Sequence, residues 1–332
     1  MKLARRALFR LGALGGALGL AAGFWPMARA RRAPEPRLSA ELDCDPTSAS
    51  ANYAARYRPP EYLAAGSRDA LHTPPAAGSA APGSVQDVRL TIIETTLEVA
   101  NRSNLAVYTF DGVVPGPILR APVGSRLRIT LDNRSNLPHS LHFHGAHDVS
   151  QDGLARVAPA GTQVYDLEAG PVGLHPYHCH VPPYSWHMAK GMYGAFIVDP
   201  IEARPAAHEF VLCLSGFDTD GDGRNDIYAF NGVAGYYERF PIKVPAGELV
   251  RIYLLNMIEH EPLATFHLHA QTFDLYRSGT GLAPSEHTDV VSLGQAERAM
   301  IEFRLPRRGR YMFHPHQSHM AERGAMGYVV AI

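Results

Sequence analysis

The 332-residue sequence predicts an all-β protein that contains two copies of one β-sandwich domain. Three observations lead to this expectation. The chain has 30 glycines, 26 prolines and only 19% charged residues, which is typical of short strands joined by many turns. From Val85 onward, short runs with alternating apolar and polar residues are separated by Gly, Pro and Asn turns. A set of histidine motifs in the first half of this region recurs in the second half.

The N-terminus has the features of an export signal. Paired arginines at positions 5 and 6 precede an apolar stretch from Leu11 to Trp25, and Ala28-Arg29-Ala30 offers a small-x-small cleavage site. The arginine pair resembles a twin-arginine signal. We therefore expect residues 1–30 to be removed on export to the periplasm or the cell exterior, with no membrane insertion afterwards. An uncleaved anchor is the alternative.

Residues 31–84 are rich in Ala, Pro, Ser and Gly and have weak periodicity, so we expect an arm or linker there. In an exported protein Cys44 and Cys213 could form a disulfide, but Cys213 fits equally well as a core residue of the strand-like run 209–217. The net charge of −1 gives no indication that nucleic acid is a partner.

An internal repeat defines the two domains. Leu137–Gly145 (LPHSLHFHG) matches Leu263–Ala270 (LATFHLHA), and His178–Gly194 matches His314–Gly327. Each copy therefore has one His-x-His pair in its middle and a second pair near its end. The predicted domain boundaries are 85–200 and 201–332.

One cysteine lies between two histidines, in His178-Cys179-His180. Two imidazoles, a thiolate and a weakly bound thioether are the ligands of a blue copper site, and the motifs supply all four. The predicted ligands of this type 1 site are His139, Cys179, His187 and Met192. A buried, inert cysteine beside surface histidines is the alternative for a lone cysteine, and the additional histidines disfavour it.

The second copy lacks two of these ligands. Ala264 stands where the first copy has His139, and Pro315 stands where it has Cys179. A blue copper site needs its thiolate and both imidazoles. We therefore expect one such site per chain, in the first domain.

Eight histidines form four His-x-His pairs at repeated positions: His142 and His144, His178 and His180, His267 and His269, His314 and His316. Residues i and i+2 of a strand point to the same face, so each pair directs two imidazoles the same way. Exposed strand histidines would explain any single pair. Four pairs at repeated positions instead predict a site for three copper ions.

On these motifs the chain resembles the multicopper oxidases, specifically the two-domain, laccase-like group with blue copper in the first domain. The resemblance covers about residues 85 to 332 and includes YTFDGVVPGPILRAPVGSRLRITLDN, YHCH, HTDVVSLGQAERAMIEF and FHPH. It implies two tandem cupredoxin-like Greek-key β-sandwiches. It also implies four copper ions per chain, one of type 1, one of type 2 and two of type 3.

The resemblance assigns the paired histidines to individual ions. The type 2 ion takes His142 and His267; one type 3 ion takes His144, His178 and His316, and the other takes His180, His269 and His314. Because each domain supplies four ligands, the cluster must lie between domains. In two-domain relatives the second domain comes from a neighbouring subunit, which implies a homotrimer.

The implied reaction takes single electrons from a small reducing substrate or redox protein and reduces O2 to water. Cys179 would connect the type 1 site to the cluster, and the donor is expected to reach the site through an exposed edge of His187. Asp152 resembles an acidic residue that the family places near the cluster, where a carboxyl group can deliver protons. An ordinary Asp-Gly turn would explain Asp152 almost equally well.

Two other functions remain open. His187 follows Cys179 by eight residues, a spacing that resembles copper nitrite reductases. Such an enzyme needs a type 2 copper with three histidines and would not require all eight. The second is a copper-binding or electron-transfer protein without turnover. The sequence leaves the donor undefined among phenols, aromatic amines, metal ions and small redox proteins.

An acidic segment, DTDGDGRND, has carboxylates at alternate positions around a glycine, as calcium loops do. Its candidate ligands are Asp218, Asp220, Asp222 and Asp226. Ala229 stands at the twelfth position, where a calcium loop has glutamate, so a solvated acidic turn is the alternative.

Overall fold

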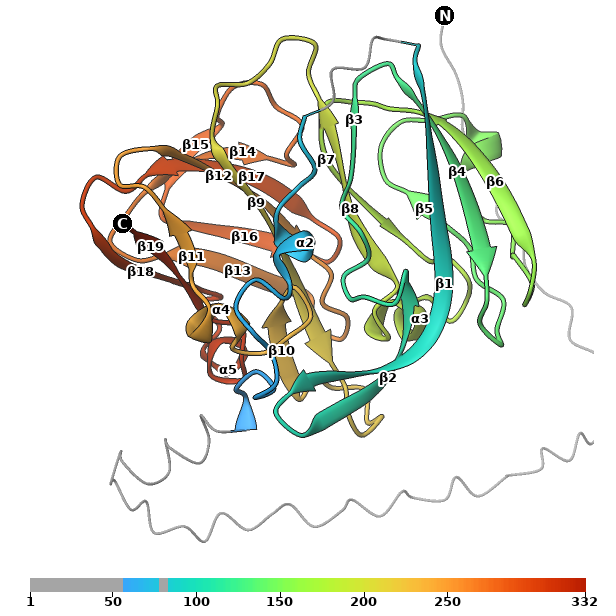
Figure 1. Cartoon of the computed structure of the whole chain (residues 1–332), viewed down its shortest axis with the longest axis horizontal. Helices are drawn as coiled ribbons and strands as arrows, with labels where there is room; N and C mark the ends of the chain where they lie inside the picture. The colour runs from blue at the N-terminus through green and yellow to red at the C-terminus, as the bar shows by residue number, and fades with distance from the viewer. Residues whose placement is uncertain (1–55, 78–82) are drawn as a thin grey trace, which may run out of the picture. The chain divides into compact units, whose positions relative to one another are not determined.

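The computed structural model describes residues 56–77 and 83–332 (Figure 1). The predicted signal and Cys44 lie outside these residues. The first half of the described chain contains the strands β1 (Val85–Ala100), β2 (Ser103–Phe110), β3 (Leu119–Pro122), β4 (Arg126–Asn133), β5 (His142–Phe143), β6 (Thr162–Glu168), β7 (Gly173–His178) and β8 (Tyr193–Asp199).

The second half contains eleven strands: β9 (His208–Phe217), β10 (Ile227–Phe230), β11 (Ile242–Val244), β12 (Leu249–Asn256), β13 (Leu263–Leu268), β14 (Phe273–Arg277), β15 (Glu286–Thr288), β16 (Val290–Gly294), β17 (Arg298–Arg304), β18 (Gly309–His314) and β19 (Gly327–Ala331). Helices are few and short: α2 (Asp69–His72), η1 (Val149–Gln151), α3 (Tyr184–Ala189), α4 (Tyr236–Arg239) and α5 (Ser318–Glu322). Within residues 56–77 and 83–332, no helix is long and apolar enough to span a membrane.

The two halves have the same sheet topology. The sheet β2-β1-β4-β6 of the first half corresponds to β10-β9-β12-β17 in the second, with one parallel pair between antiparallel pairs in each. The sheet β3-β8-β7-β5 likewise corresponds to β11-β19-β18-β13. The predicted all-β fold with two copies of one β-sandwich is confirmed.

Two central strands of the second half, β9 and β12, are buried along most of their length. Alternate side chains of a strand face opposite sides of its sheet. Leu212 and Leu254 face the core of the second sandwich, whereas Cys213 and Leu255 belong to a separate cluster that also contains apolar side chains of the first half. The sequences of these strands are nearly continuous apolar runs, because each strand is packed against a hydrophobic cluster on both faces.

The two halves are also joined by a row of alternating charges. Arg120 on β3 donates to Asp199 on β8 at 2.8 Å and to Glu209 on β9 at 2.7 Å. Glu209 also accepts from Arg251 at 2.9 Å, and Arg251 donates to Glu302 at 2.6 Å. The side chains of Arg120 and Arg251 are only 5% and 3% exposed, so each is neutralised by carboxylates within the protein.

Replacing Glu209 by glutamine should destabilise the protein. Burial alone would raise the pKa of the Glu209 carboxyl group, but its bonds to Arg120 and Arg251 outweigh burial and lower the pKa below its usual value. The variant leaves two buried guanidinium groups short of a carboxylate, so we expect the free energy of unfolding at pH 7 to fall by about 3 kcal/mol.

The Glu209 contribution should depend on pH. A carboxyl group with a lowered folded-state pKa stabilises the protein above its unfolded-state pKa, and this stabilisation is lost as the pH falls through the folded-state value. Denaturant unfolding at pH 7 and below pH 4 measures the difference. The control is Glu286→Gln, which removes an exposed pair with Arg277 and should cost less than about 1 kcal/mol. Equal effects of both variants would contradict this account.

Part of the predicted arm packs on both halves. The Arg68 guanidinium donates to the carbonyl oxygens of Val114 and Asn231 at 2.9 and 3.0 Å. Leu71 and His72 are buried in the same segment. Cys213 is buried in β9, and because Cys44 lies outside the described residues, their pairing remains a prediction.

Candidate metal centre

The predicted type 1 residues come together between β7, α3 and the loop before β5. The Sγ atom of Cys179 lies 3.7 Å from Nδ1 of His139 and 3.6 Å from Nδ1 of His187, and the two Nδ1 atoms are 3.0 Å apart. Met192 is fully buried, and its carbonyl oxygen accepts a hydrogen bond from the Cys179 amide. We refer to these four residues, His139, Cys179, His187 and Met192, as the cysteine cluster.

The cysteine cluster is chemically suited to a metal cation. Burial, together with the charge of His187, lowers the pKa of His139 to about 3, so this imidazole is neutral and can act as a ligand. Burial raises the pKa of the Cys179 thiol, and a bound cation would favour the thiolate instead. Three ligand atoms that converge within 3.7 Å in an apolar surrounding fit a blue copper ion.

The expectation that an edge of His187 is exposed is wrong. His187 is only 3% exposed, because α3 turns its side chain inward. The ring of Trp186, the preceding residue, lies 5.2 Å from the His187 ring. The ring of Tyr108 from β2 contacts both imidazoles, stacked on His187 and tilted against His139. Sequence reasoning missed Tyr108 because it comes from a strand far from the ligand motifs.

The first four paired histidines form one group, which we call the first quartet: His142, His144, His178 and His180. Strand pairing places His142 opposite His178 on β5 and β7. Nε2 of His144 and Nε2 of His178 are 3.0 Å apart, and the His142 and His180 rings are 5.1 Å apart. Burial is the main cause that lowers the pKa of His144 to about 3 and that of His178 to about 4, so both are neutral.

The other four paired histidines form a matching second quartet: His267, His269, His314 and His316. Here His267 lies opposite His314 on β13 and β18, and Nε2 of His269 lies 2.8 Å from Nε2 of His314. The His267 and His316 rings are 5.5 Å apart. The repeat therefore gives the same arrangement of four imidazoles twice.

The outer nitrogen atoms of equivalent histidines also have equivalent partners. Nδ1 of His142 lies 2.8 Å from the carbonyl oxygen of Asp152, and Nδ1 of His267 lies 2.8 Å from that of Asp289. Such contacts hold Nδ1 protonated and leave Nε2 free to bind a metal ion. This arrangement fits ligation of each quartet through Nε2.

The two quartets are separate within one chain. No hydrogen bond or ring contact joins an imidazole of the first quartet to one of the second in the part of the chain that the structure describes. The first quartet is buried or partly buried, whereas His269 and His316 of the second are exposed. Within one chain, the printed contacts therefore group these eight imidazoles into two sets of four.

Asp152 lies directly behind the first quartet. Its carboxylate is 3.2 Å from Nδ1 of His142 and 4.0 Å from Nε2 of His147. Gly153 allows this approach: a Cβ there would lie 1.8 Å from the carbonyl oxygen of Leu141, and its φ is +76°. The structure thus brings Asp152 to a quartet histidine, together with His147, which the sequence did not identify as a site residue.

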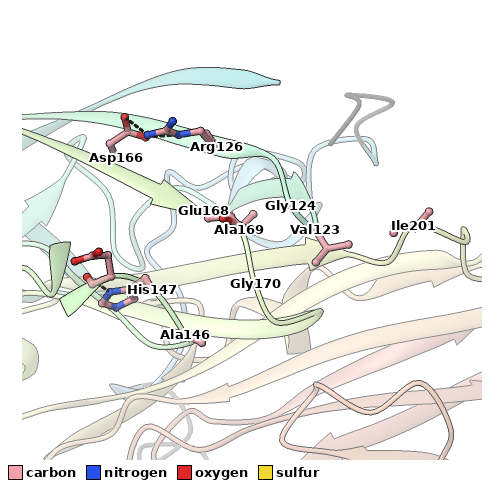
Figure 2. A pocket seen from close by; sticks show the side chains of 11 residues that line it. Val123, Gly124, Arg126, Ala146, His147, Asp166, Glu168, Ala169, Gly170 and Ile201 are labelled. Atoms are coloured by element: carbon pink, nitrogen blue, oxygen red, sulfur yellow. Dashed lines mark hydrogen bonds and ion pairs between the residues drawn. The ribbon is translucent and has the colours of Figure 1, made fainter. Parts of the chain in front are cut away.

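A cavity of about 690 Å³, lined by both charged and apolar residues, opens beside this loop (Figure 2). His147 lines one side of the cavity, and the Arg126–Asp166 ion pair lines the opposite side. His147 therefore has both this cavity and the Asp152 carboxylate as neighbours.

The second domain has no cysteine cluster at the equivalent place. Ala264 is fully buried there, and His319, which corresponds to His187, lies 3.5 Å from the Glu261 carboxylate and 5.5 Å from the ring of Tyr228. These contacts satisfy His319 without a metal ion.

The acidic loop remains a weaker candidate. Three of its carboxylates, those of Asp218, Asp220 and Asp226, come within 4.8 Å of one another, but that of Asp222 does not join them. The carboxylates already accept hydrogen bonds from the loop's own backbone, such as that from Gly223 to Asp218 at 2.9 Å. Calcium binding here remains a prediction.

Two multicopper oxidase family models match the chain, one over residues 91–203 and one over residues 214–332. The crystal structure of a multicopper oxidase is 38% identical, with a TM-score of 0.77 over 81% of this chain and 98% of that one. The structure of a copper nitrite reductase from Nitrosomonas europaea is 29% identical, with a TM-score of 0.70 over 75% of this chain and 94% of that one.

Curated relatives include the copper-containing nitrite reductase of Neisseria meningitidis. It is 29% identical over 282 residues, which cover 78% of this chain and 72% of that protein. The family models and the structural relatives share two cupredoxin-like domains with the fold described above. The chain therefore belongs to the multicopper oxidase family, a family of copper-containing oxidoreductases.

Proposed function

We propose that this protein is a laccase-like oxidase that couples one-electron oxidation of a reducing substrate to the four-electron reduction of O2 to water. The presence of two complete histidine quartets in matching geometry carries this proposal. A nitrite reductase needs only three histidines for its second copper, whereas eight can hold three ions. When bound, a copper cluster would supply the oxygen chemistry, and the chain supplies its placement and environment.

The proposed ligands follow from the distances within each quartet. His144 and His178 bring their Nε2 atoms within 3.0 Å, which allows one ion to bind both, and His269 and His314 do the same at 2.8 Å. We assign these two pairs to the two type 3 ions, completed by His316 and His180 respectively. His142 and His267 then hold the type 2 ion. The cysteine cluster would hold the type 1 ion.

A homotrimer is the proposed assembly. Apolar side chains are exposed near each quartet: Val149 and Leu154 follow His144, Leu263 lies on β13, and Val290 lies on β16 opposite His267. Contact with a neighbouring subunit would remove this apolar area from water. A ring in which the first quartet of one chain faces the second quartet of the next would complete the ligand sets and close on itself.

Protons must reach the cluster as oxygen is reduced. We propose that the Asp152 carboxyl group delivers them, because it lies 3.2 Å from His142 and 4.0 Å from His147, which lines the cavity. The N-terminal sequence supports export to the periplasm or cell exterior as the proposed location.

The second candidate is a copper nitrite reductase. The similarity to the enzymes from Neisseria meningitidis and Nitrosomonas europaea favours it, as does the eight-residue spacing between Cys179 and His187. Copper analysis and acceptor assays of the purified protein separate the two. The oxidase should contain about four copper ions per chain, as the eight histidines and the cysteine cluster require, and consume oxygen. About two ions per chain with turnover of nitrite under anaerobic conditions would favour the reductase instead.

A further inference from the structure

No residue of the cysteine cluster has a usable exposed surface. Cys179, Met192 and His139 are fully buried, and His187 is 3% exposed. Trp186 is an exposed aromatic residue in contact with the cluster: it is 40% exposed, and its ring lies 5.2 Å from the His187 ring. An electron donor in solution therefore meets Trp186 before it meets any of the four predicted ligands.

Tyr108 completes a continuous set of ring contacts. Its centroid lies 5.2 Å from Trp186, 5.1 Å from His139 and 6.0 Å from His187, with the last pair stacked at 28°. These separations are within the range of direct aromatic contact. Both imidazoles of the cluster are thus in contact with an aromatic pair, Trp186 and Tyr108, of which one member is exposed.

The second domain, which lacks a cysteine cluster, has a tyrosine at the position equivalent to Tyr108. Tyr228 follows the repeat, since YAFNGVA matches YTFDGVV, and its ring lies 5.5 Å from His319. Tyr228 is 1% exposed and donates a hydrogen bond to Glu261 at 2.8 Å. Tyr108 is instead partly exposed, and its hydroxyl group has no hydrogen-bond partner among the residues that the structure describes. The position is open to solvent only in the domain that has the thiol.

We propose that Trp186 and Tyr108 are the electron entry of this protein, in place of an edge of His187. A one-electron donor contacts the exposed indole ring, and its electron passes through the two aromatic rings to the imidazoles of the cysteine cluster. The donor is oxidised by one electron and the copper site is reduced by one, with no bond made or broken on either ring. Electron transfer weakens steeply with distance, and every step of this path is a ring contact with centroids 5.1 to 6.0 Å apart. The inference rests on the type 1 site of the proposed function.

The alternative is that both rings only shield the cluster from water. A shielding role predicts that their removal changes the site itself, through its blue absorption or its reduction potential. An entry role predicts a slower arrival of electrons at an unchanged site. Measuring both properties on the same variants separates the two.

The chain offers a specific optical probe for this test. It contains two tryptophans, Trp25 and Trp186. In the full chain with Trp25→Phe, all tryptophan emission comes from Trp186. Copper loading should quench this emission, because the indole ring is in contact with a predicted ligand, and unquenched emission in a protein with a blue site would contradict the described geometry.

The decisive experiment compares Trp186→Leu, Trp186→Phe and Tyr108→Leu in the copper-loaded protein. Hydroquinone is mixed with each protein without oxygen, and the bleaching of the blue band is followed by stopped flow. We expect Trp186→Leu and Tyr108→Leu to slow bleaching by at least about tenfold at an unchanged reduction potential, and Trp186→Phe to restore most of the rate. Tyr228→Phe is the matched control and should bleach at the parent rate.

Two results would overturn the proposal. The first is that Trp186→Leu bleaches at the parent rate. The second is that its bleaching slows only as much as a change in the reduction potential of the blue site explains. A parent protein without any blue band would instead overturn the type 1 site, and with it the proposed function. The blue band therefore tests the type 1 site, and the bleaching rate tests the role of Trp186 and Tyr108.

Discussion

Replacing Cys179 by serine is expected to abolish the blue absorption and the oxidation of donors. A serine hydroxyl group cannot replace a thiolate, which under the proposed function would bind the type 1 ion and connect it to the neighbouring residues His178 and His180. Loss of a residue that only supports a metal ligand typically lowers activity by about 10–100-fold. We expect the Cys179→Ser variant to lower the rate of donor oxidation by more than this. Absorption spectra and oxygen-electrode assays with a phenol measure both effects.

The matched control for this variant is Cys213→Ser. Cys213 is buried in the core between the two halves, away from the cluster. It should retain the blue band and donor oxidation, although with lower stability, since burying a hydroxyl group there has a cost. A Cys179→Ser protein that oxidises phenols at the parent rate would show that electrons do not pass through the thiolate.

Removing the proposed type 2 ligands, with His142→Ala and His267→Ala together, should stop oxygen reduction while the blue site remains. Neither histidine touches the cysteine cluster, so the blue band should persist, and a donor should still bleach it. Without the type 2 ion the cluster cannot complete the four-electron reaction. We expect oxygen uptake to fall by more than about 100-fold, beyond the range typical for residues that only support a ligand.

This double variant also separates the two candidate functions. A nitrite reductase would not require His142 and His267 together, so nitrite turnover that survives in the variant would contradict the oxidase. His208→Ala is the control, because His208 lies on β9, contacts only the exposed Glu248 within the described residues, and belongs to neither quartet. It should leave copper content and oxygen uptake unchanged.

Much of the candidate site could be predicted from the sequence because its ligands occur in short motifs on paired strands. The i, i+2 spacing in HFH, HCH, HLH and HPH fixes two imidazoles on one face, and the repeat indicates that both domains use it. The all-β fold follows from the same alternation. For these elements, local sequence and three-dimensional position are directly related.

The residues that surround the ligands could not be predicted in the same way. Tyr108 reaches the cysteine cluster from β2, and Asp152 reaches His142 because Gly153 lets a loop pass close to Leu141. His187 is buried because α3 places it inward, which a short loop sequence does not indicate. Such contacts depend on tertiary packing between distant segments. A stronger signal was available in the match between YTFDGVV and YAFNGVA, which singles out Tyr108 and its counterpart.

We propose that the assembled protein holds both a type 1 site and a trinuclear cluster that reduces oxygen. The most direct test is the number of electrons that the copper-loaded protein delivers to each O2 molecule, with hydroquinone as donor and nitrite as the competing acceptor. The account predicts about four electrons per O2, with water as the product and no effect of nitrite. Absence of oxygen uptake together with reduction of nitrite would contradict it.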